Sequence, residues 1–138
     1  MIKAELGRQL MIRVGNDVTS VADITTIIAQ EGINLVAICA YEVEGNVALM
    51  FVTEDNNHAK KVLTDKGCHV NEEEIILLSI DNKPGALQSV TEKIARAGIS
   101  LQLMYGSVNQ VDDVTRLVLI SDKNMDVMLL IKTELERH

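Results

Sequence analysis

Aromatic residues are nearly absent from this sequence. It has Phe51, Tyr41 and Tyr105, and it has no tryptophan. Proteins that bind bases or sugars usually stack them on aromatic faces, so this scarcity argues against oligonucleotide and carbohydrate ligands. It also means that a hydrophobic core must be built from aliphatic side chains.

Basic residues are outnumbered by acidic ones. Thirteen Lys and Arg stand against 20 Asp and Glu, which gives a formal net charge of -7. An extended phosphate backbone or an anionic bilayer would be repelled, so no nucleic acid and no membrane is expected as a partner. The apolar runs are also far shorter than the roughly twenty residues needed to cross a bilayer.

Cysteine is scarce as well, with Cys39 and Cys68 alone. Two cysteines cannot form the disulfide framework of a small secreted module, and no basic start followed by an apolar run indicates a signal peptide. A cytoplasmic location is therefore expected. The Cys and His spacing offers no set of four metal ligands, and no nucleophile stands in a pattern with a base. We predict no metal, no cofactor and no enzymatic activity.

What the chain does contain is enough apolar material to fold. It has 138 residues, of which 47% are hydrophobic and 24% charged. This length suits one ordinary domain or two very small ones that support each other. The choice between these depends on whether the sequence repeats itself.

The sequence does repeat itself. A shift of 66 residues (82 minus 16) places residues 14–40 on residues 80–106, and keeps apolar, polar and glycine positions in register. After the hairpin that follows, the offset becomes 67, where Asp55 falls on Asp122 and Asn57 on Asn124. Chance similarity of two amphipathic segments would not keep this register, so we predict a duplication.

The hydrophobic spacing predicts the elements of each copy. Leu10, Ile12 and Val14 alternate as in a strand with one buried face, and then Val21 and Ile24 begin the spacing of an amphipathic helix. A hairpin, a second helix and a returning strand follow, giving the order βαββαβ. For the second copy we predict a strand at 77–81, a helix at 84–97, a hairpin at 99–108 and 114–121, and a last helix at 124–137.

We expect two units, residues 1–73 with a short N-terminal extension and residues 74–138. In the second unit no residues remain for the last strand, which leaves a sheet edge uncovered. Either the N-terminal residues 2–6 or a neighbouring chain could pair with that edge. We state both as hypotheses.

The loop at residues 81–87 lies between a predicted strand and a predicted helix. The unpaired N–H donors at a helix N-terminus can receive a carboxylate. Pro84 in the first turn fixes the backbone, and Gly85 lets a ligand approach it closely. Asn82 can cap the helix or turn to a ligand, and Asp81 can accept an ammonium group. The loop thus suits a small zwitterion, the alternative being ordinary cap chemistry.

A known family shows this pattern. Residues 82–87 (Asn-Lys-Pro-Gly-Ala-Leu), followed by Ile94-Ala95 and residues 97–101 (Ala-Gly-Ile-Ser-Leu), resemble the signature of the ACT domain, a small-molecule regulatory module of amino-acid metabolism. The duplication resembles stand-alone tandem ACT proteins. The resemblance implies an α+β fold of two ferredoxin-like βαββαβ units side by side, with antiparallel sheets and helices on one face.

The resemblance also implies an amino acid bound where the loop of one unit approaches another unit. The residues that it points to by position are Asp81, Asn82, Gly85, Ala86, Leu87, Ile99 and Ser100, with Gln102 as a neighbour. The first copy lacks both Pro and Gly at the corresponding turn, which puts an equivalent second site in doubt. Its polar candidates are Asn16 and Asn34, with Asn16 as an ordinary helix cap the alternative.

Two functional hypotheses follow from these expectations. The leading one is a non-catalytic sensor that binds an amino acid and regulates a partner enzyme of amino-acid metabolism or its own assembly, with a homodimer expected. The alternative is an interaction module without a ligand, which uses sheet edges and helix faces to hold a homodimer or an enzyme subunit together.

Overall fold

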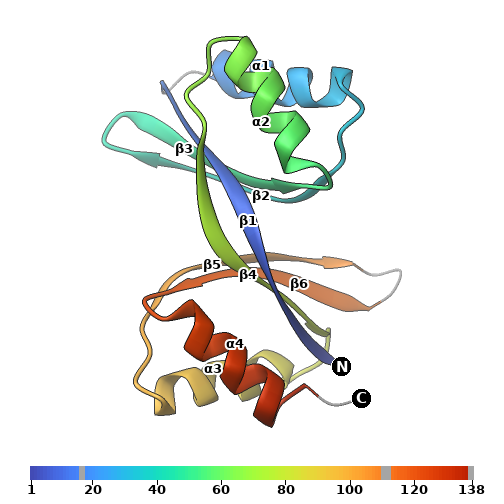
Figure 1. Cartoon of the computed structure of the whole chain (residues 1–138), viewed down its shortest axis with the longest axis vertical. Coiled ribbons are helices and arrows are strands. Elements are labelled where there is room, and N and C mark those ends of the chain that lie inside the picture. The colour runs from blue at the N-terminus through green and yellow to red at the C-terminus, as the bar shows by residue number, and fades with distance from the viewer. Residues whose placement is uncertain (16–17, 110–112, 137–138) are drawn as a thin grey trace. The chain divides into compact units, whose positions relative to one another are not determined.

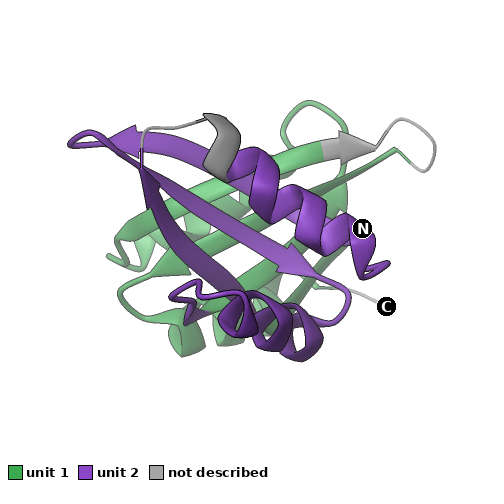
Figure 2. Ribbon diagram, turned by 90° about the horizontal axis from the view of Figure 1, so that it is seen from above, with its two compact units in different colours: residues 1–7, 74–138 green, residues 8–73 purple. Residues whose placement is uncertain are grey.

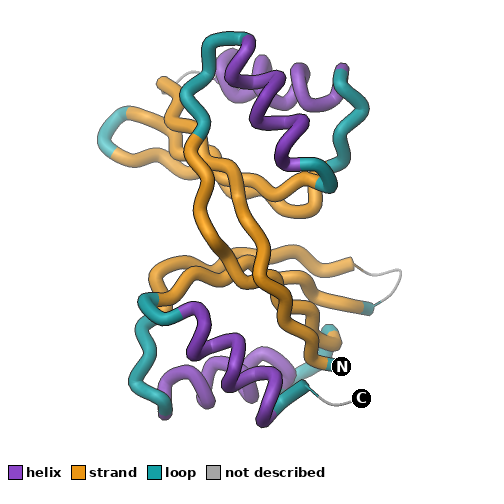
Figure 3. Tube along the Cα trace, in the orientation of Figure 1, coloured by secondary structure: helices purple, strands orange, loops and turns teal. Residues whose placement is uncertain are grey.

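The computed structural model describes residues 1–15, 18–109 and 113–136. Six strands hydrogen-bond in the order β2-β3-β1-β4-β6-β5. The elements, shown in Figure 1 and by type in Figure 3, are β1 (Ile2–Gly15), α1 (Val18–Gln30), β2 (Leu35–Val43), β3 (Asn46–Thr53), α2 (Asn56–Asp65), β4 (Asn71–Asp81), α3 (Ala86–Arg96), β5 (Leu101–Asn109), β6 (Val114–Ser121) and α4 (Asn124–Glu134).

The chain divides into two compact units of the ferredoxin-like type. Unit 2 comprises residues 8–73 and contains the first copy of the repeat. Unit 1 comprises residues 1–7 and 74–138 and contains the second copy (Figure 2). Strands β1 and β4 each contribute residues to both units, because the division falls within both of them. Neither cysteine forms a disulfide. None of the described helices is long and apolar enough to cross a membrane.

Unit 2 is built as the hydrophobic spacing predicts. Strand β3 pairs antiparallel with β1 and with β2, and both helices pack on one face of these strands. Phe51 is fully buried there, opposite Leu10 on one neighbouring strand and Ile38 on the other. The core is otherwise aliphatic, as the scarcity of aromatics implied: Leu10, Ile12, Ile24, Ile28, Leu49, Ala59, Leu63 and Val70.

Unit 1 repeats this arrangement with a strand borrowed from the start of the chain. Strand β6 pairs antiparallel with β4 and β5, and helices α3 and α4 pack on one face. Residues 1–7 belong to this unit, where β1 neighbours β4, and Ala4 is fully buried in its core. The N–H of Asp81 also donates to the carbonyl of Met1 at 3.2 Å. This confirms the hypothesis that the N-terminal segment covers the edge left by the missing last strand.

The start of α3 differs from the prediction. The helix begins at Ala86 rather than Pro84, and Gly85 precedes it in the left-handed conformation with φ 86°. The N-cap position has no side-chain hydrogen bond, so Asn82 does not cap the helix. A left-handed residue interrupts helical dihedrals, which places Pro84 in the preceding turn. The last helix of the chain, α4, ends at Glu134, three residues earlier than predicted.

The offset between the repeats was wrong after the hairpin. Asn56 Oδ1 accepts from the N–H and the hydroxyl of Thr53, both at 2.9 Å. Asn124 Oδ1 accepts from the N–H and the hydroxyl of Ser121 at 2.8 and 2.9 Å. Asn56 therefore corresponds to Asn124, an offset of 68 (124 minus 56) rather than 67. The sequence pattern alone aligns the neighbouring Asn57 with Asn124, because Asn56 and Asn57 are adjacent.

Candidate functional site

The first turn of α3, directly after the loop from β4, carries backbone N–H donors without an acceptor among the described residues. Ala86 N–H bonds to Lys83 O and Ser89 N–H to Gly85 O, each at 3.2 Å. The N–H groups of Leu87 and Gln88 find no acceptor among the described residues. Because unpaired N–H groups at a helix N-terminus carry partial positive charge, they can receive an anionic group.

Asp81 already binds cations of the protein. Its Oδ2 pairs with the N-terminal ammonium of Met1 and lies 3.9 Å from Lys83 Nζ. The hydrogen bond from that ammonium lowers the pKa of the Asp81 carboxyl below its usual 3.8. Asp81 is therefore ionised near neutral pH. Both ion pairs are made through Oδ2, so Oδ1 can accept a further donor.

An open cavity of about 310 Å³ lies at this loop. Its volume is at the lower end of the range typical of small-molecule sites. The cavity brings together Asp81, Gly85 and Ala86 of the predicted residues, whereas Asn82 and Leu87 do not line it. Leu87 instead packs against the core of unit 1. The residues that line the cavity are Met1, Ile2, Asp81, Lys83, Pro84, Gly85, Ala86 and Ser89.

The predicted site does not include five of these lining residues: Met1, Ile2, Lys83, Pro84 and Ser89. Lys83 stood inside the quoted motif, and its charge beside a helix N-terminus was a usable signal. Ser89 is one turn into α3, and its hydroxyl donates to Ala86 O at 2.8 Å. Met1 and Ile2 reach the cavity only because the N-terminal segment pairs with β4, which local sequence around the loop does not indicate.

The other three predicted residues of unit 1 lie at the opposite end of its strands. Asp81 pairs with Val114, whereas Leu101 pairs with Ser121, seven residues further along β6 (121 minus 114). At the rise of an extended strand this separation is about 24 Å. Unit 1 therefore does not bring its loop together with Ile99 and Ser100, which precede β5, or with Gln102 near its start.

Those residues have local roles within unit 1. Ile99 packs against the core, and Gln102 is exposed. Ser100 N–H donates to Asp122 Oδ1 at 3.1 Å, and Ser100 O accepts from Asp122 N–H at 3.1 Å. These bonds tie the start of β5 to the end of β6.

In the first copy the candidate residue Asn34 bonds to Glu54, with its side-chain amide in place of the backbone N–H that Ser100 uses. Asn34 Nδ2 donates to Glu54 Oε2 at 3.2 Å, and Asn34 O accepts from Glu54 N–H at 3.0 Å. This is the counterpart of the contact between Ser100 and Asp122. Asn16 lies outside the described residues. In the part of the chain that the structure describes, no three His, Cys, Asp or Glu side chains cluster as metal ligands would.

Comparisons with known proteins agree with this architecture. A family model described as an ACT domain pair matches residues 7–135. Protein BT0572 from Bacteroides thetaiotaomicron superposes with a TM-score of 0.88 at 27% sequence identity, over 95% of this chain and 90% of that chain. No curated protein sequence matches.

Two more distant solved structures share the fold. The regulatory subunit of aspartate kinase from Thermus thermophilus, in its ligand-free form, aligns with a TM-score of 0.69 at 13% identity, over 98% of this chain and 97% of that chain. A structure of aspartokinase alpha and beta subunits aligns with a TM-score of 0.66 at 17% identity, over 96% and 95%.

Proposed function

The chain belongs to the family of ACT domain pairs, and on that premise we propose that it is a regulatory protein that binds an amino acid at the loop before α3. ACT domains are regulatory rather than catalytic domains. The observation that carries the proposal is an open cavity of about 310 Å³ that reaches Ala86 at the start of α3, where the N–H groups of the next two residues, Leu87 and Gln88, have no acceptor among the described residues. The fold shared with a regulatory subunit of aspartate kinase supports it.

Each end of an amino acid meets a matching group at this loop. The carboxylate would receive the N–H groups of Leu87 and Gln88 and the ammonium of Lys83, which lines the cavity. The ammonium would donate to Oδ1 of Asp81, whose charge is held by the neighbouring cations. Gly85 keeps the backbone side of the cavity open, since nothing lies within 4 Å of the place where a Cβ would stand.

Binding would regulate by favouring one arrangement of the protein over another. A ligand shifts such an equilibrium only by its difference in affinity for the two states. We propose a homodimer in which a second copy brings Ile99, Ser100 and Gln102 to the loop, because unit 1 itself holds them about 24 Å away. The regulated partner would be an enzyme of amino-acid metabolism.

Calorimetric titration with each of the twenty common amino acids tests the proposal. We expect at least one to bind, and Lys83→Met to weaken that binding about tenfold by removing a charge-assisted hydrogen bond. Lys123→Met is the matched control, because Lys123 precedes α4 and does not line the cavity. Absence of binding by all twenty, or equal affinity of both variants, would contradict the proposal.

Exposed apolar residues on the edge strands favour a second candidate, an interaction module without a ligand. Strands β2 and β5 stand at the two ends of the strand order. Leu35 and Ile38 are 41% and 45% exposed, and their counterparts Leu101 and Met104 are 37% and 42% exposed. Such edges can pair with another chain. Light scattering distinguishes the candidates, since the mass of a ligand-free module would not respond to any amino acid.

A further inference from the structure

Unit 2 contains a cavity of its own, away from the loop before α3. Its volume is about 490 Å³, within the range of small-molecule sites. It lies where helix α1 faces the end of β1 and the residues that follow α2. The residues that line it are Val14, Asp23, Ile24, Thr26, Ile27, Lys66 and Cys68.

The lining of this cavity is apolar with two opposite charges at its edge. Ile24 is 4% exposed and belongs to the core of unit 2, while Val14 and Ile27 pack against that core. Asp23 and Lys66 are exposed, and neither has an ion-pair partner among the described residues. The cavity therefore offers an aliphatic surface, one carboxylate and one ammonium group.

The repeat provides an internal comparison for these positions. With an offset of 66 in the first helix of each copy and 68 in the second, Ile27 corresponds to Lys93 and Lys66 to Glu134. In unit 1 these two counterparts form an ion pair, with 3.5 Å between Lys93 Nζ and Glu134 Oε1. The pair joins α3 to α4 across the place where unit 2 has its cavity.

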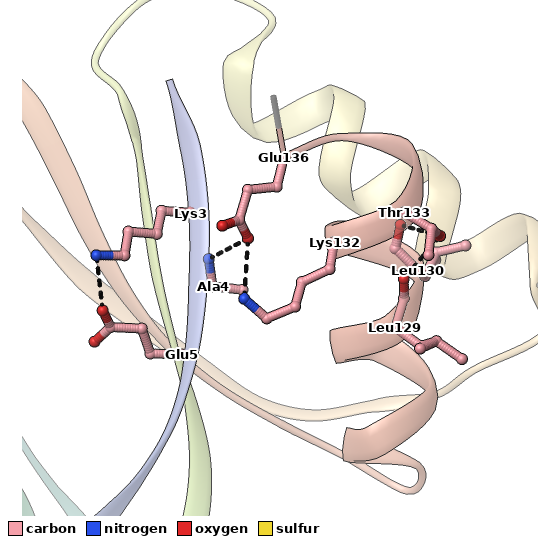
Figure 4. A network of polar contacts seen from close by, with 8 residues as sticks. All are labelled: Lys3, Ala4, Glu5, Leu129, Leu130, Lys132, Thr133 and Glu136. Atoms are coloured by element: carbon pink, nitrogen blue, oxygen red, sulfur yellow. Dashed lines mark hydrogen bonds and ion pairs between the residues drawn. The ribbon is translucent and has the colours of Figure 1, made fainter. Parts of the chain in front are cut away.

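A second set of contacts ties the same end of unit 1 together. Cys68 corresponds to Glu136, since their N–H groups bond to the carbonyls of Leu63 and Ile131 in the two copies. Glu136 Oε2 accepts from Lys132 Nζ at 3.3 Å and from the N–H of Ala4 at 3.5 Å (Figure 4). Unit 2 has a thiol in place of this carboxylate and Thr64 in place of the lysine. It therefore cannot form the equivalent polar contacts.

We propose that the unit 2 cavity is a binding site for a small zwitterion with an aliphatic side chain. Lys66 receives the carboxylate, Asp23 receives the ammonium, and Ile24 and Ile27 contact the aliphatic part. Asp23 precedes Ile27 by one helical turn, about 6 Å along the same face. Asp23 and Lys66 both line this one cavity of about 490 Å³, as does Ile27. This proposal is independent of the site proposed at the loop before α3.

Protection of Cys68 from alkylation measures occupancy of the cavity. L-leucine, L-isoleucine and L-valine are the probes, iodoacetamide is the reagent, and peptide mass spectrometry reads each cysteine. We expect at least one probe at millimolar concentration to slow alkylation of Cys68 but not of Cys39, which lies on β2 and does not line the cavity. Equal rates with and without all three probes overturn the proposal.

Analogues that lack one charge test the two assigned roles. For leucine these are 4-methylpentanoate, without the ammonium, and 3-methylbutylamine, without the carboxylate. Each analogue should protect Cys68 about tenfold more weakly than leucine, because it loses a charge-assisted hydrogen bond. Equal protection by either analogue would overturn the assignment of a zwitterion.

Variants that close the cavity complete the test. The double change Ile27→Lys with Lys66→Glu transfers the ion pair of unit 1 and should abolish protection. Lys66→Met alone should weaken the protection of Cys68 about tenfold. This single variant tests the proposal if the double variant fails to fold. Lys61→Met is the matched control, an exposed lysine of α2 outside the cavity. Lys83→Met must leave protection unchanged. Wild-type protection in Lys66→Met, or its loss in Lys83→Met, overturns the proposal.

Discussion

Arg8 and Glu72 form an ion pair within unit 2, with 2.8 Å between Arg8 Nε and Glu72 Oε2. Lys60 Nζ lies 3.0 Å from the other oxygen of Glu72. The side chain of Glu72 is 21% exposed, which makes it the least exposed of these three side chains. The pair joins the part of β1 in unit 2 to the start of β4, while Lys60 anchors α2 to the same carboxylate.

The pH dependence of stability should report this contact. Hydrogen bonds from Arg8 and then Lys60 lower the pKa of Glu72 below its usual 4.5. A lowered pKa stabilises the folded state above the unfolded pKa, and this contribution is lost as the pH falls through the folded value. Glu72→Gln should therefore reduce the free energy of unfolding by about 1 kcal/mol or less at neutral pH. Urea titrations should show the difference from wild type vanish in acid. A difference that persists there would contradict the assignment.

Gly106 permits a close approach of β5 to β6. A Cβ at this position would contact Leu117 Cδ2 and stand 2.5 Å from the carbonyl oxygen of Arg116. Because the carbonyl is backbone and cannot turn aside, Gly106→Ala should lower the free energy of unfolding by about 1–3 kcal/mol. Gly15→Ala is the matched control, since nothing lies within 4 Å of its Cβ position. Equal stability of the two variants in urea would contradict this expectation and show that β5 shifts to accommodate the added methyl group.

The offset of 68 between the repeats makes a prediction about three asparagines. Asn56 and Asn124 each fix the residue three positions earlier through two hydrogen bonds. Replacing either by Ala should cost about 1–2 kcal/mol in thermal or urea unfolding, because buried donors lose their acceptor. Asn57→Ala should change stability by only a few tenths, since Asn57 is exposed. A loss at Asn57 as large as at Asn56 would favour the offset of 67.

The conformation of Gly85 also predicts a graded series. Its φ of 86° is unfavourable for any residue with a Cβ, so Gly85→Ala should cost about 1–2 kcal/mol of stability. Asparagine tolerates the left-handed region better, and Gly85→Asn should recover part of that loss. Thermal unfolding of the three proteins checks the order. If alanine and asparagine cost the same, the left-handed conformation is not what the glycine provides.

The order of elements could be predicted from the sequence because it depends on local spacing. Leu10 and Ile12 alternate in a strand, Ile24 and Ile28 recur in a helix, and the same spacing returns in the second copy. The uncovered sheet edge also followed from counting elements. Its partner could not be selected, since the hydrophobic pattern does not distinguish residues 2–6 from a strand of another chain.

The site could be predicted only in part, because its geometry depends on backbone angles and distant packing. The Pro-Gly turn identified the loop, yet the left-handed φ of Gly85 moved the helix start to Ala86 and removed the cap role of Asn82. The unit 2 cavity gave no sequence signal at all. Ile27 and Lys66, far apart along the chain, both line it and cannot form the ion pair that their counterparts form in unit 1.

The amide signals of Leu87 and Gln88 provide the most direct test of the proposed regulatory site. Nitrogen-proton correlation spectra would be recorded on the full chain while an amino acid that binds in calorimetry is added, and again with its methyl ester. We predict that the acid shifts both amide protons downfield as they donate to its carboxylate, and that the ester shifts them far less. Binding of the acid with both signals unmoved would contradict the account.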